Sequence, residues 1–255
     1  FLLGEVWEDA TTKFGFDKRR TYLLGKGLDS VMNYPFKNAV LDFVKGKPAE
    51  QAMTEILTIC EHYPAPAMDT ALNFLSTHDT ERALTVIADE PANGRGRAWQ
   101  SGRCVTGDAY EEGLLRLRMA YAIIYTLPGV PCLYYGDEIA MQGYRDPFNR
   151  AFFRWDAHEQ RLRPVLAQLA QLAQLRHTCE AFRTGQLRVL RAEGGILHYQ
   201  RVGKVETAEI IVNRTEHIIV ETLASGKSTE VNPMGFTIVV EEVGHNPNHS
   251  YYDYV

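Results

Sequence analysis

The most constraining feature of this sequence is an alternation of short apolar segments with longer amphipathic ones across the first two-thirds of its 255 residues. The apolar segments are nearly continuous, as in strands buried on both faces of a sheet. They predict strands at residues 1–6, 28–33, 73–77 and 130–135. Apolar residues at helical spacing predict intervening helices at residues 37–44, 50–62, 80–88 and 110–126. This alternation is typical of parallel α/β architecture.

The pattern changes after Gly185. Five short segments rich in β-branched and aromatic residues follow, with turn-forming residues between them and no helical pattern. These segments are "QLRVLRA", "GILHYQRV", "AEIIVNRT", "HIIVETL" and "GFTIVVEEV". They predict a small antiparallel β-sandwich or meander. We therefore expect two domains, residues 1–183 and 184–255, with the tail from residue 244 loose or packed at an edge.

One more helix is predicted at residues 158–182, just before this change. Six apolar residues recur there at helical spacing and would form a single buried stripe. They are Leu162, Val165, Leu166, Leu169, Leu172 and Ala173.

Composition excludes several classes of function. A net charge of −5 and a pI near 5.9 argue against a nucleic-acid-binding protein, which usually has a basic face. No apolar run reaches the roughly 20 residues that a membrane span requires. The four cysteines contain no CxxC pair, which argues against a zinc site and favours a reducing, cytoplasmic compartment.

Polar residues follow three of the predicted strands. Glu5 ends the first, Asn33 and Tyr34 follow the second, and His78 and Asp79 follow the third. The carboxyl ends of parallel strands lie on one face of such a fold, where active sites form. An isolated Asp79 is more typical of a helix start, because Asp often caps helices. Three converging strand ends favour a functional site instead.

Such a set of side chains suits the cleavage of glycosidic bonds. A retaining glycosidase uses a protonated carboxyl as acid and an ionised carboxylate as nucleophile. A carboxyl at a dry strand tip beside an aromatic ring tends to stay protonated near neutral pH, and Glu5 beside Trp7 fits this description. Asp79 would remain ionised while His78 donates hydrogen bonds to sugar hydroxyls. Tyr34 and Trp7 would offer stacking faces, although ordinary core packing is an equal alternative for Trp7.

Four segments carry a resemblance to a known family. "GEVWED", "DSVMNYPF", "FLSTHDTER" and "GVPCLYYGDEIAMQGYRDPFNRAFFRWD" occur in the order and spacing of the α-amylase superfamily of glycoside hydrolases, family 13. The forms "MNYPF" and "STHDTER" are most similar to its neopullulanase/cyclomaltodextrinase branch. The resemblance implies the second half of a (β/α)8 TIM barrel, strands five to eight, followed by an antiparallel domain. It also implies an α-glucan substrate such as a maltooligosaccharide, cyclodextrin or pullulan.

The resemblance assigns roles to individual residues. It implies that Glu5 is the general acid/base and that Asp79 assists catalysis by stabilising the transition state. The residues that would contact the sugar are then Trp7, Asn33, Tyr34, His78 and Arg82. The segment after the last barrel strand matches the family through Gly136, Asp137, Glu138, Asp146, Pro147, Asn149 and Arg150.

The departures from the family pattern are equally informative. The nucleophile motif, Gly-x-Arg-x-Asp, and an earlier motif ending in Asn-His are absent. Glu8 stands where close relatives are expected to have His, and Thr77 stands where some branches of the family have Asn. A whole barrel takes about 250 residues, and this chain has room for four strand–helix units before its β domain. We therefore expect a fragment that is inactive alone. Its exposed sheet edges would pair with the missing N-terminal half or form a homodimer.

Two alternatives to a catalytic fragment are open. A non-catalytic amylase-like scaffold or sugar-binding chain would keep the fold, but it would have no need of Glu5, His78, Asp79 and Arg82 together. An unrelated doubly wound protein would carry a Gly-rich phosphate loop after a strand, and the sequence has none. No cofactor is expected, and the residues give no indication of a structural calcium ion.

Overall fold

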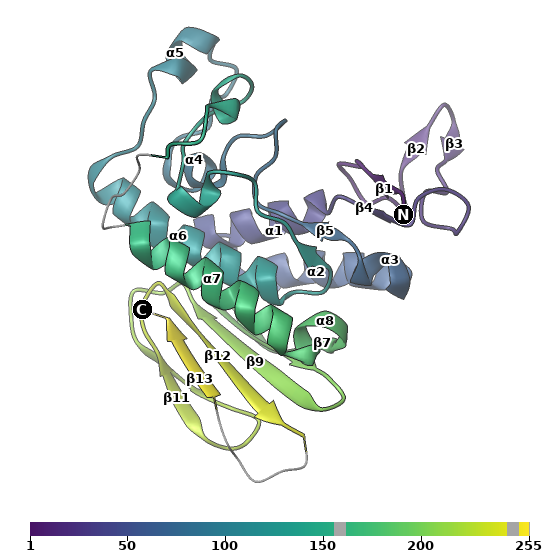
Figure 1. Cartoon of the computed structure of the whole chain (residues 1–255), viewed down its shortest axis with the longest axis vertical. Helices are drawn as coiled ribbons and strands as arrows, with labels where there is room; N and C mark the ends of the chain where they lie inside the picture. Colours follow the sequence, from purple (N-terminus) through teal and green to yellow (C-terminus); the bar gives the residue numbers. More distant parts are fainter. Residues whose placement is uncertain (156–161, 244–249, 255) are drawn as a thin grey trace.

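Four short parallel strands form the frame of the N-terminal part. The computed structural model describes residues 1–155, 162–243 and 250–254 (Figure 1). The strands are β1 (Leu3–Gly4), β4 (Ser30–Val31), β5 (Leu72–Asn73) and β6 (Val130–Pro131). β1 pairs with β4 and β5 with β6, and a parallel bridge between Met32 and Leu72 joins the two pairs. The predicted parallel order is confirmed, but each strand is only two residues long.

Helices connect these strands. Between β4 and β5 lie α1 (Tyr34–Lys45), α2 (Ala49–His62) and α3 (Ala65–Asp69). Between β5 and β6 lie α4 (Ala83–Ala88), α5 (Arg97–Ser101) and α6 (Gly107–Thr126). A hairpin of β2 (Phe14–Gly15) and β3 (Lys18–Arg19) follows β1, and the 3-10 turns η1 (Asp137–Ile139) and η2 (Phe148–Arg150) follow β6. α1 begins at its cap Asn33 and ends at Gly46, whose φ of 135° few other residues adopt.

The predicted helix at 158–182 is two helices, and residues 158–161 lie outside the described part. α7 (Arg163–Thr178) and α8 (Glu180–Thr184) meet at Cys179, which is extended with ψ 115°. The predicted stripe is also partly wrong, because Leu166 and Ala173 are exposed while Gln168 and Leu175 are buried. The remaining members of the stripe are buried as predicted: Leu162, Val165, Leu169 and Leu172.

The C-terminal part is antiparallel, as predicted. One sheet has the order β13-β12-β9-β8-β7. Its strands are β7 (Gln186–Glu193), β8 (Ile196–Val202), β9 (Glu206–Asn213), β12 (Gly235–Glu242) and β13 (Ser250–Tyr254). β10 (Ile219–Thr222) and β11 (Ser228–Val231) form a separate two-stranded ribbon. The sequence did not predict β11 or β13; the tail pairs with β12 at the sheet edge, and residues 244–249 lie outside the described part.

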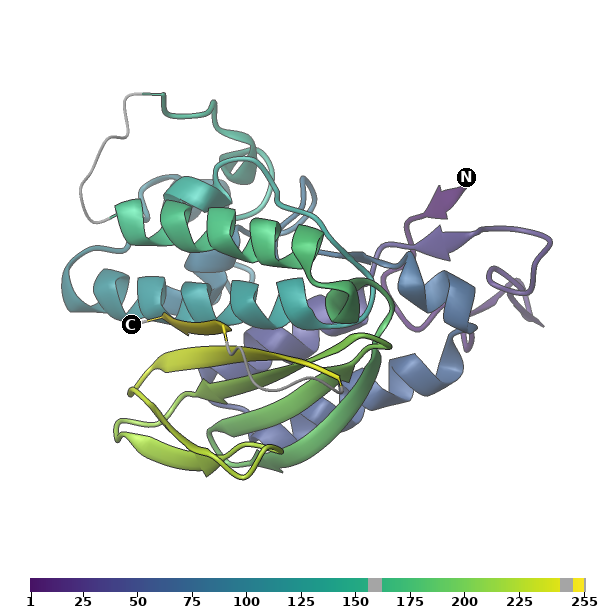
Figure 2. The ribbon, with the colours of Figure 1, turned by 60° about the horizontal axis from the view of Figure 1, so that its bottom comes forward.

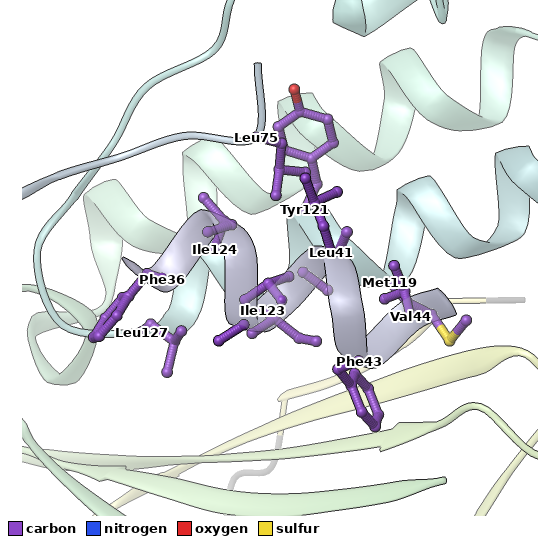
Figure 3. Close-up of a cluster of buried hydrophobic side chains, with 14 of the residues drawn as sticks. Phe36, Leu41, Phe43, Val44, Leu75, Met119, Tyr121, Ile123, Ile124 and Leu127 are labelled. Atoms are coloured by element: carbon purple, nitrogen blue, oxygen red, sulfur yellow. The ribbon is translucent and has the colours of Figure 1, made fainter. Parts of the chain in front are cut away.

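One face of this sheet packs against the helices. β12 contacts α6, β7 contacts α2 and β9 contacts α8 (Figure 2). A single apolar cluster contains Tyr199, Ile210 and Ile238 of the sheet together with residues of α1 and α6. Figure 3 shows part of the helical side of this core, with Phe36, Leu41, Phe43, Val44, Leu75, Met119, Tyr121, Ile123, Ile124 and Leu127 labelled. The β strands thus rest on the same core that supports the parallel strands.

The cysteines are free thiols in this fold: Cys60, Cys104, Cys132 and Cys179. Burial raises the pKa of Cys60 to about 11 and that of Cys179 to about 12, so both stay protonated at neutral pH. Among the helices that the structure describes, none combines the length and the apolar composition needed to cross a membrane.

Candidate active site

The carboxyl ends of β1, β4 and β5 bring three predicted residues together. Glu5 follows β1, Tyr34 opens α1 after β4, and Asp79 lies beyond β5. Tyr34 donates a hydrogen bond from Oη to Glu5 Oε1 at 2.8 Å, and Trp7 donates from Nε1 to the same oxygen at 3.1 Å. Both donors therefore reach one carboxylate oxygen, and Oε2 keeps its lone pairs for another partner.

Asp79 and His78 lie beside Glu5. His78 Nε2 is 3.3 Å from Asp79 Oδ2. One nitrogen or oxygen from each of Glu5, His78 and Asp79 lies within 4.8 Å of the other two. Glu5 and His78 are exposed, and the Asp79 side chain is 39% exposed. We call Glu5, His78 and Asp79 the acidic cluster; it is open to solvent, so the predicted dry environment of Glu5 is wrong.

The aromatic residues near this cluster have unequal exposure. Trp7 is 45% exposed and stacks on Tyr34 with ring centroids 4.5 Å apart. Tyr34 is 1% exposed and its ring also meets the edge of Phe74. Burial raises the pKa of Tyr34 far above its ordinary value, and Glu5 nearby adds to the shift. Tyr34 therefore stays a proton donor to Glu5, and it cannot offer the sugar-stacking face that we expected. Trp7 is exposed enough to offer such a face.

Asn33 and Arg82 lie beneath the acidic cluster and have no exposed surface. Asn33 accepts a hydrogen bond from the Phe36 amide and donates to Asn73 Oδ1 at 2.9 Å, so its side chain caps α1 and ties β4 to β5. Neither residue reaches the surface where a sugar would bind. A polar residue after a predicted strand does not reveal from sequence whether its side chain supports the site or contacts the substrate.

Arg82 forms a buried ion pair with Asp137. Arg82 Nη1 lies 3.2 Å from Asp137 Oδ1 and donates to the Tyr135 carbonyl at 2.7 Å. The guanidinium carbon also lies 4.8 and 4.9 Å from the ring centroids of Tyr134 and Tyr135. Burial raises the pKa of Asp137 to about 6, although hydrogen bonds from Ser76 and other neighbours and the Arg82 charge oppose the shift.

This raised pKa predicts a pH dependence of stability. Between about pH 4 and 6 the Asp137 carboxyl is protonated in the folded protein but ionised in the unfolded chain. The contribution of Asp137 to the free energy of unfolding therefore falls as the pH rises through this range. The change is at most about 3 kcal/mol. Urea unfolding at several pH values should show this slope flattened in Asp137→Asn. Asp69→Asn, at an exposed position, should keep the slope; an unchanged slope in Asp137→Asn contradicts the prediction.

Two residues of the loop after β6, Asn149 and Arg150, support the acidic cluster, and no specific role was predicted for them. Arg150 Nη2 lies 3.1 Å from Asp79 Oδ1, and its Nε donates to the His78 carbonyl at 3.0 Å. Buried Asn149 donates from Nδ2 to the carbonyls of His78 and Thr80, both at 2.8 Å. Both residues belong to the segment after β6 that resembles the α-amylase superfamily. Their contacts with His78 and Asp79 span some 70 positions, so no local sequence pattern could predict them.

The acidic cluster has the ligand atoms that a divalent cation could use, namely two carboxylates and an imidazole. Exposed groups of this kind are common without a metal, and nothing else in the described residues points to one. Several cavities among the described residues lie away from the cluster. One of about 290 Å³ is lined by Arg103, Val105, Tyr110, Met141 and neighbouring residues, none of them in the cluster. We therefore place the candidate active site at the acidic cluster because of its side chains, although none of these cavities contains it.

Comparison with known proteins agrees with this geometry. Residues 1–179 match the family described as "Alpha amylase, catalytic domain". A cyclomaltodextrinase from Geobacillus thermopakistaniensis is 31% identical over 84% of this chain and 32% of its own length. Neopullulanase 2 from Thermoactinomyces vulgaris is 29% identical over 89% of this chain and 34% of its own. The chain thus spans about a third of the length of these relatives.

The solved structures give the same result. Cyclic α-maltosyl-(1→6)-maltose hydrolase from Arthrobacter globiformis superposes with a TM-score of 0.75 and 26% identity, covering 94% of this chain and 48% of that one. The resemblance to the neopullulanase/cyclomaltodextrinase branch is therefore confirmed. The match over residues 1–179 shows that this chain belongs to the α-amylase family of glycoside hydrolases.

Proposed function

We propose that this chain supplies the acid/base half of a retaining glycosidase that hydrolyses α-glucosidic bonds in maltooligosaccharides, cyclodextrins or pullulan. The observation that carries the proposal is the convergence of Glu5, His78 and Asp79 within 4.8 Å at the ends of parallel strands. Trp7 adds an exposed aromatic face next to Glu5, and sugar rings stack on such faces. The relatives named cyclomaltodextrinase and neopullulanase favour cyclodextrins and pullulan among these substrates.

The hydrogen bonds to Glu5 suggest which oxygen carries the catalytic proton. Tyr34 and Trp7 both donate to Oε1, so the proton of the neutral acid belongs on Oε2. In the first step Glu5 protonates the leaving glycosidic oxygen while an Asp nucleophile bonds to the anomeric carbon. In the second, Glu5 takes a proton from water, whose oxygen displaces the nucleophile. Asp79 and His78 hold hydroxyls of the reacting sugar.

The nucleophile would come from a preceding segment. We infer that β1, β4, β5 and β6 correspond to strands five to eight of a (β/α)8 barrel, with residues 1–183 as its second half and 184–255 as the following β domain. Apolar residues exposed along β1 and its neighbours, Phe1, Leu2 and Leu3, favour a partner at that edge. A preceding half of the barrel fits this edge better than a second copy, because it would also supply the nucleophile.

The stereochemistry of the product tests this proposal. The longer polypeptide, incubated with maltoheptaose, should release sugar whose new reducing end is first the α-anomer, because a double displacement retains configuration. Proton NMR within the first minutes distinguishes the anomers before mutarotation. Initial β-anomer would contradict a retaining mechanism. Binding without any release would favour a scaffold or sugar-binding chain instead.

A further inference from the structure

A buried polar network lies on the face of the five-stranded sheet that is turned away from the helices. His198 of β8 is 3% exposed; its Nε2 lies 2.6 Å from Glu209 Oε1 of β9, and its Nδ1 lies 3.2 Å from Glu221 Oε2 of β10. Glu209 and Glu221 are 5% and 8% exposed. One histidine thus links two strands of the sheet to the ribbon. None of these residues belongs to the acidic cluster.

Both ring nitrogens of this histidine face a carboxylate. A neutral imidazole has one donor nitrogen and one acceptor nitrogen, whereas both nitrogens of His198 face carboxylates. The arrangement is satisfied when His198 is the imidazolium cation and Glu209 and Glu221 are both ionised. Gln200 Nε2 also donates to Glu209 Oε2 at 3.0 Å, and Arg191 of β7 pairs with Glu221. Every charge in the network therefore has an opposite partner.

The ribbon has little else to hold it in place. An isolated two-stranded ribbon is marginally stable in water. The apolar cluster under β10 and β11 is small and consists of Ile211, Leu223, Val231 and Val239, with Ile219 against it. Val220, on the other side of β10, is 62% exposed. Asn213 adds hydrogen bonds to three carbonyls at the ribbon ends. The Ala224 amide, in the turn between β10 and β11, donates to both oxygens of Glu209 at 3.2 Å. The links from His198 to Glu221 and from Glu209 to Ala224 are thus a large part of the attachment.

Solvent reaches the network from two sides. A cleft of about 350 Å³ is lined by Gln200 and Glu209, and one of about 620 Å³ by His198 and Glu221. Of the other charged groups around it, Arg188 of β7 lines both clefts, Glu241 of β12 lines the first, and Glu193 pairs with Arg191. Protons from bulk water can therefore reach carboxylates whose ionisation holds the ribbon.

We propose that Glu209, His198 and Glu221 form a pH-sensitive latch that fastens the β10–β11 ribbon to the sheet and releases it in acid. Burial alone would raise the pKa of Glu209, but hydrogen bonds from His198 and Gln200 together hold it below its ordinary value. A carboxyl whose pKa is lower in the folded protein than in the unfolded chain stabilises the fold at pH values above the unfolded pKa. This stabilisation is lost as the pH falls through the folded pKa. The latch is therefore closed at neutral pH and opens in acid, as the pH falls through the lowered pKa of Glu209.

Hydrogen exchange of the whole protein, followed by mass spectrometry, tests the latch without any assay of sugar cleavage. His198→Gln removes the two separate ring nitrogens and cannot carry a positive charge. Amides of β10 and β11 should therefore exchange about tenfold faster at pH 7, as expected for one lost charged hydrogen bond. Glu221→Gln should give the same change, and the double variant should add little to it. His217→Gln, exposed just before β10, is the matched control and should resemble the wild type.

Acidification gives the second arm of the test. After correction for intrinsic exchange, wild-type ribbon amides should lose protection as the pH falls through the lowered pKa of Glu209, whereas His198→Gln should change little further. Unchanged ribbon exchange in His198→Gln would overturn the proposal. Equal acceleration of β8 and β9 would also overturn it, because His198 would then stabilise the sheet as a whole. Either result leaves the proposed glycosidase function untouched.

Discussion

Replacing Glu5 by Gln is expected to lower kcat/KM for cyclodextrin about 10²–10⁴-fold in the longer polypeptide that carries the nucleophile. Gln has the shape of the protonated acid but cannot transfer a proton to the leaving oxygen. The amide can still accept the hydrogen bonds that Tyr34 and Trp7 donate to Oε1, so the fold and the binding of substrate should persist. The loss should therefore appear in kcat, with KM little changed.

Glu8→Gln is the matched control for this variant. Glu8 lies three positions further along, is exposed, and pairs with Lys13 rather than with the acidic cluster. Its substitution should leave kcat within about twofold, as expected for a surface change of small energy. Near-normal kcat in Glu5→Gln, or an equal loss in both variants, would show that the assignment of Glu5 as acid/base is wrong.

The largest expected loss of stability comes from Arg201→Ala. Arg201 is 1% exposed and donates from Nη1 to the Thr126 carbonyl at 2.6 Å. Its Nε and Nη2 both donate to the Gly185 carbonyl, at 3.1 and 2.8 Å. These bonds join β8 to the end of α6 and to the residue before β7. Burial lowers the pKa of Arg201 to about 10, which still leaves it charged at neutral pH.

The substitution leaves two buried carbonyls without donors and opens space in the core. Since a hydrogen bond from a charged donor contributes about 1.5–3 kcal/mol, we expect the free energy of unfolding to fall by about 3–5 kcal/mol. Urea denaturation measures this directly. Arg188→Ala, on the exposed side of the same sheet, should change stability by less than about 0.5 kcal/mol. A loss below about 1 kcal/mol in Arg201→Ala would contradict the role of this residue in joining sheet and helices.

The spacing of apolar residues in the sequence predicted the helices that bury one face against the core. The long helices α1, α2 and α6 each bury one face, so apolar spacing reveals them. The parallel strands β1, β4, β5 and β6 correspond to the predicted apolar segments, although β1 and β6 are only partly buried. The ribbon strand β11 reads "STEV" and buries Val231 fully, which leaves too few apolar residues for a pattern. The break at Cys179 has no Pro or Gly to signal it. There the chain turns because α8 packs against β9, a tertiary contact.

The sequence predicted which residues form the acidic cluster, but it did not predict which neighbouring side chains are buried. Glu5, His78 and Asp79 could be predicted to converge because the carboxyl ends of parallel strands share one face. The burial of Tyr34, Asn33 and Arg82 could not be predicted, because a polar side chain at a strand end can point into the site or under it. Their hydrogen bonds to Glu5, Asn73 and Asp137 decide this, and those partners are far apart in sequence.

The most direct test of the central claim, that glucan binds over Glu5, Asp79 and Trp7, is an NMR titration of the 15N-labelled protein with maltoheptaose. Its three tryptophans give three indole signals. Trp99 lies between Arg95 and Arg103, 3.8 and 4.9 Å from its ring, and serves as the internal reference. The predicted result is a saturable shift of the Trp7 signal with Trp99 unchanged. A Trp7 signal that stays fixed while Trp99 or the 82% exposed Trp155 shifts would contradict the account.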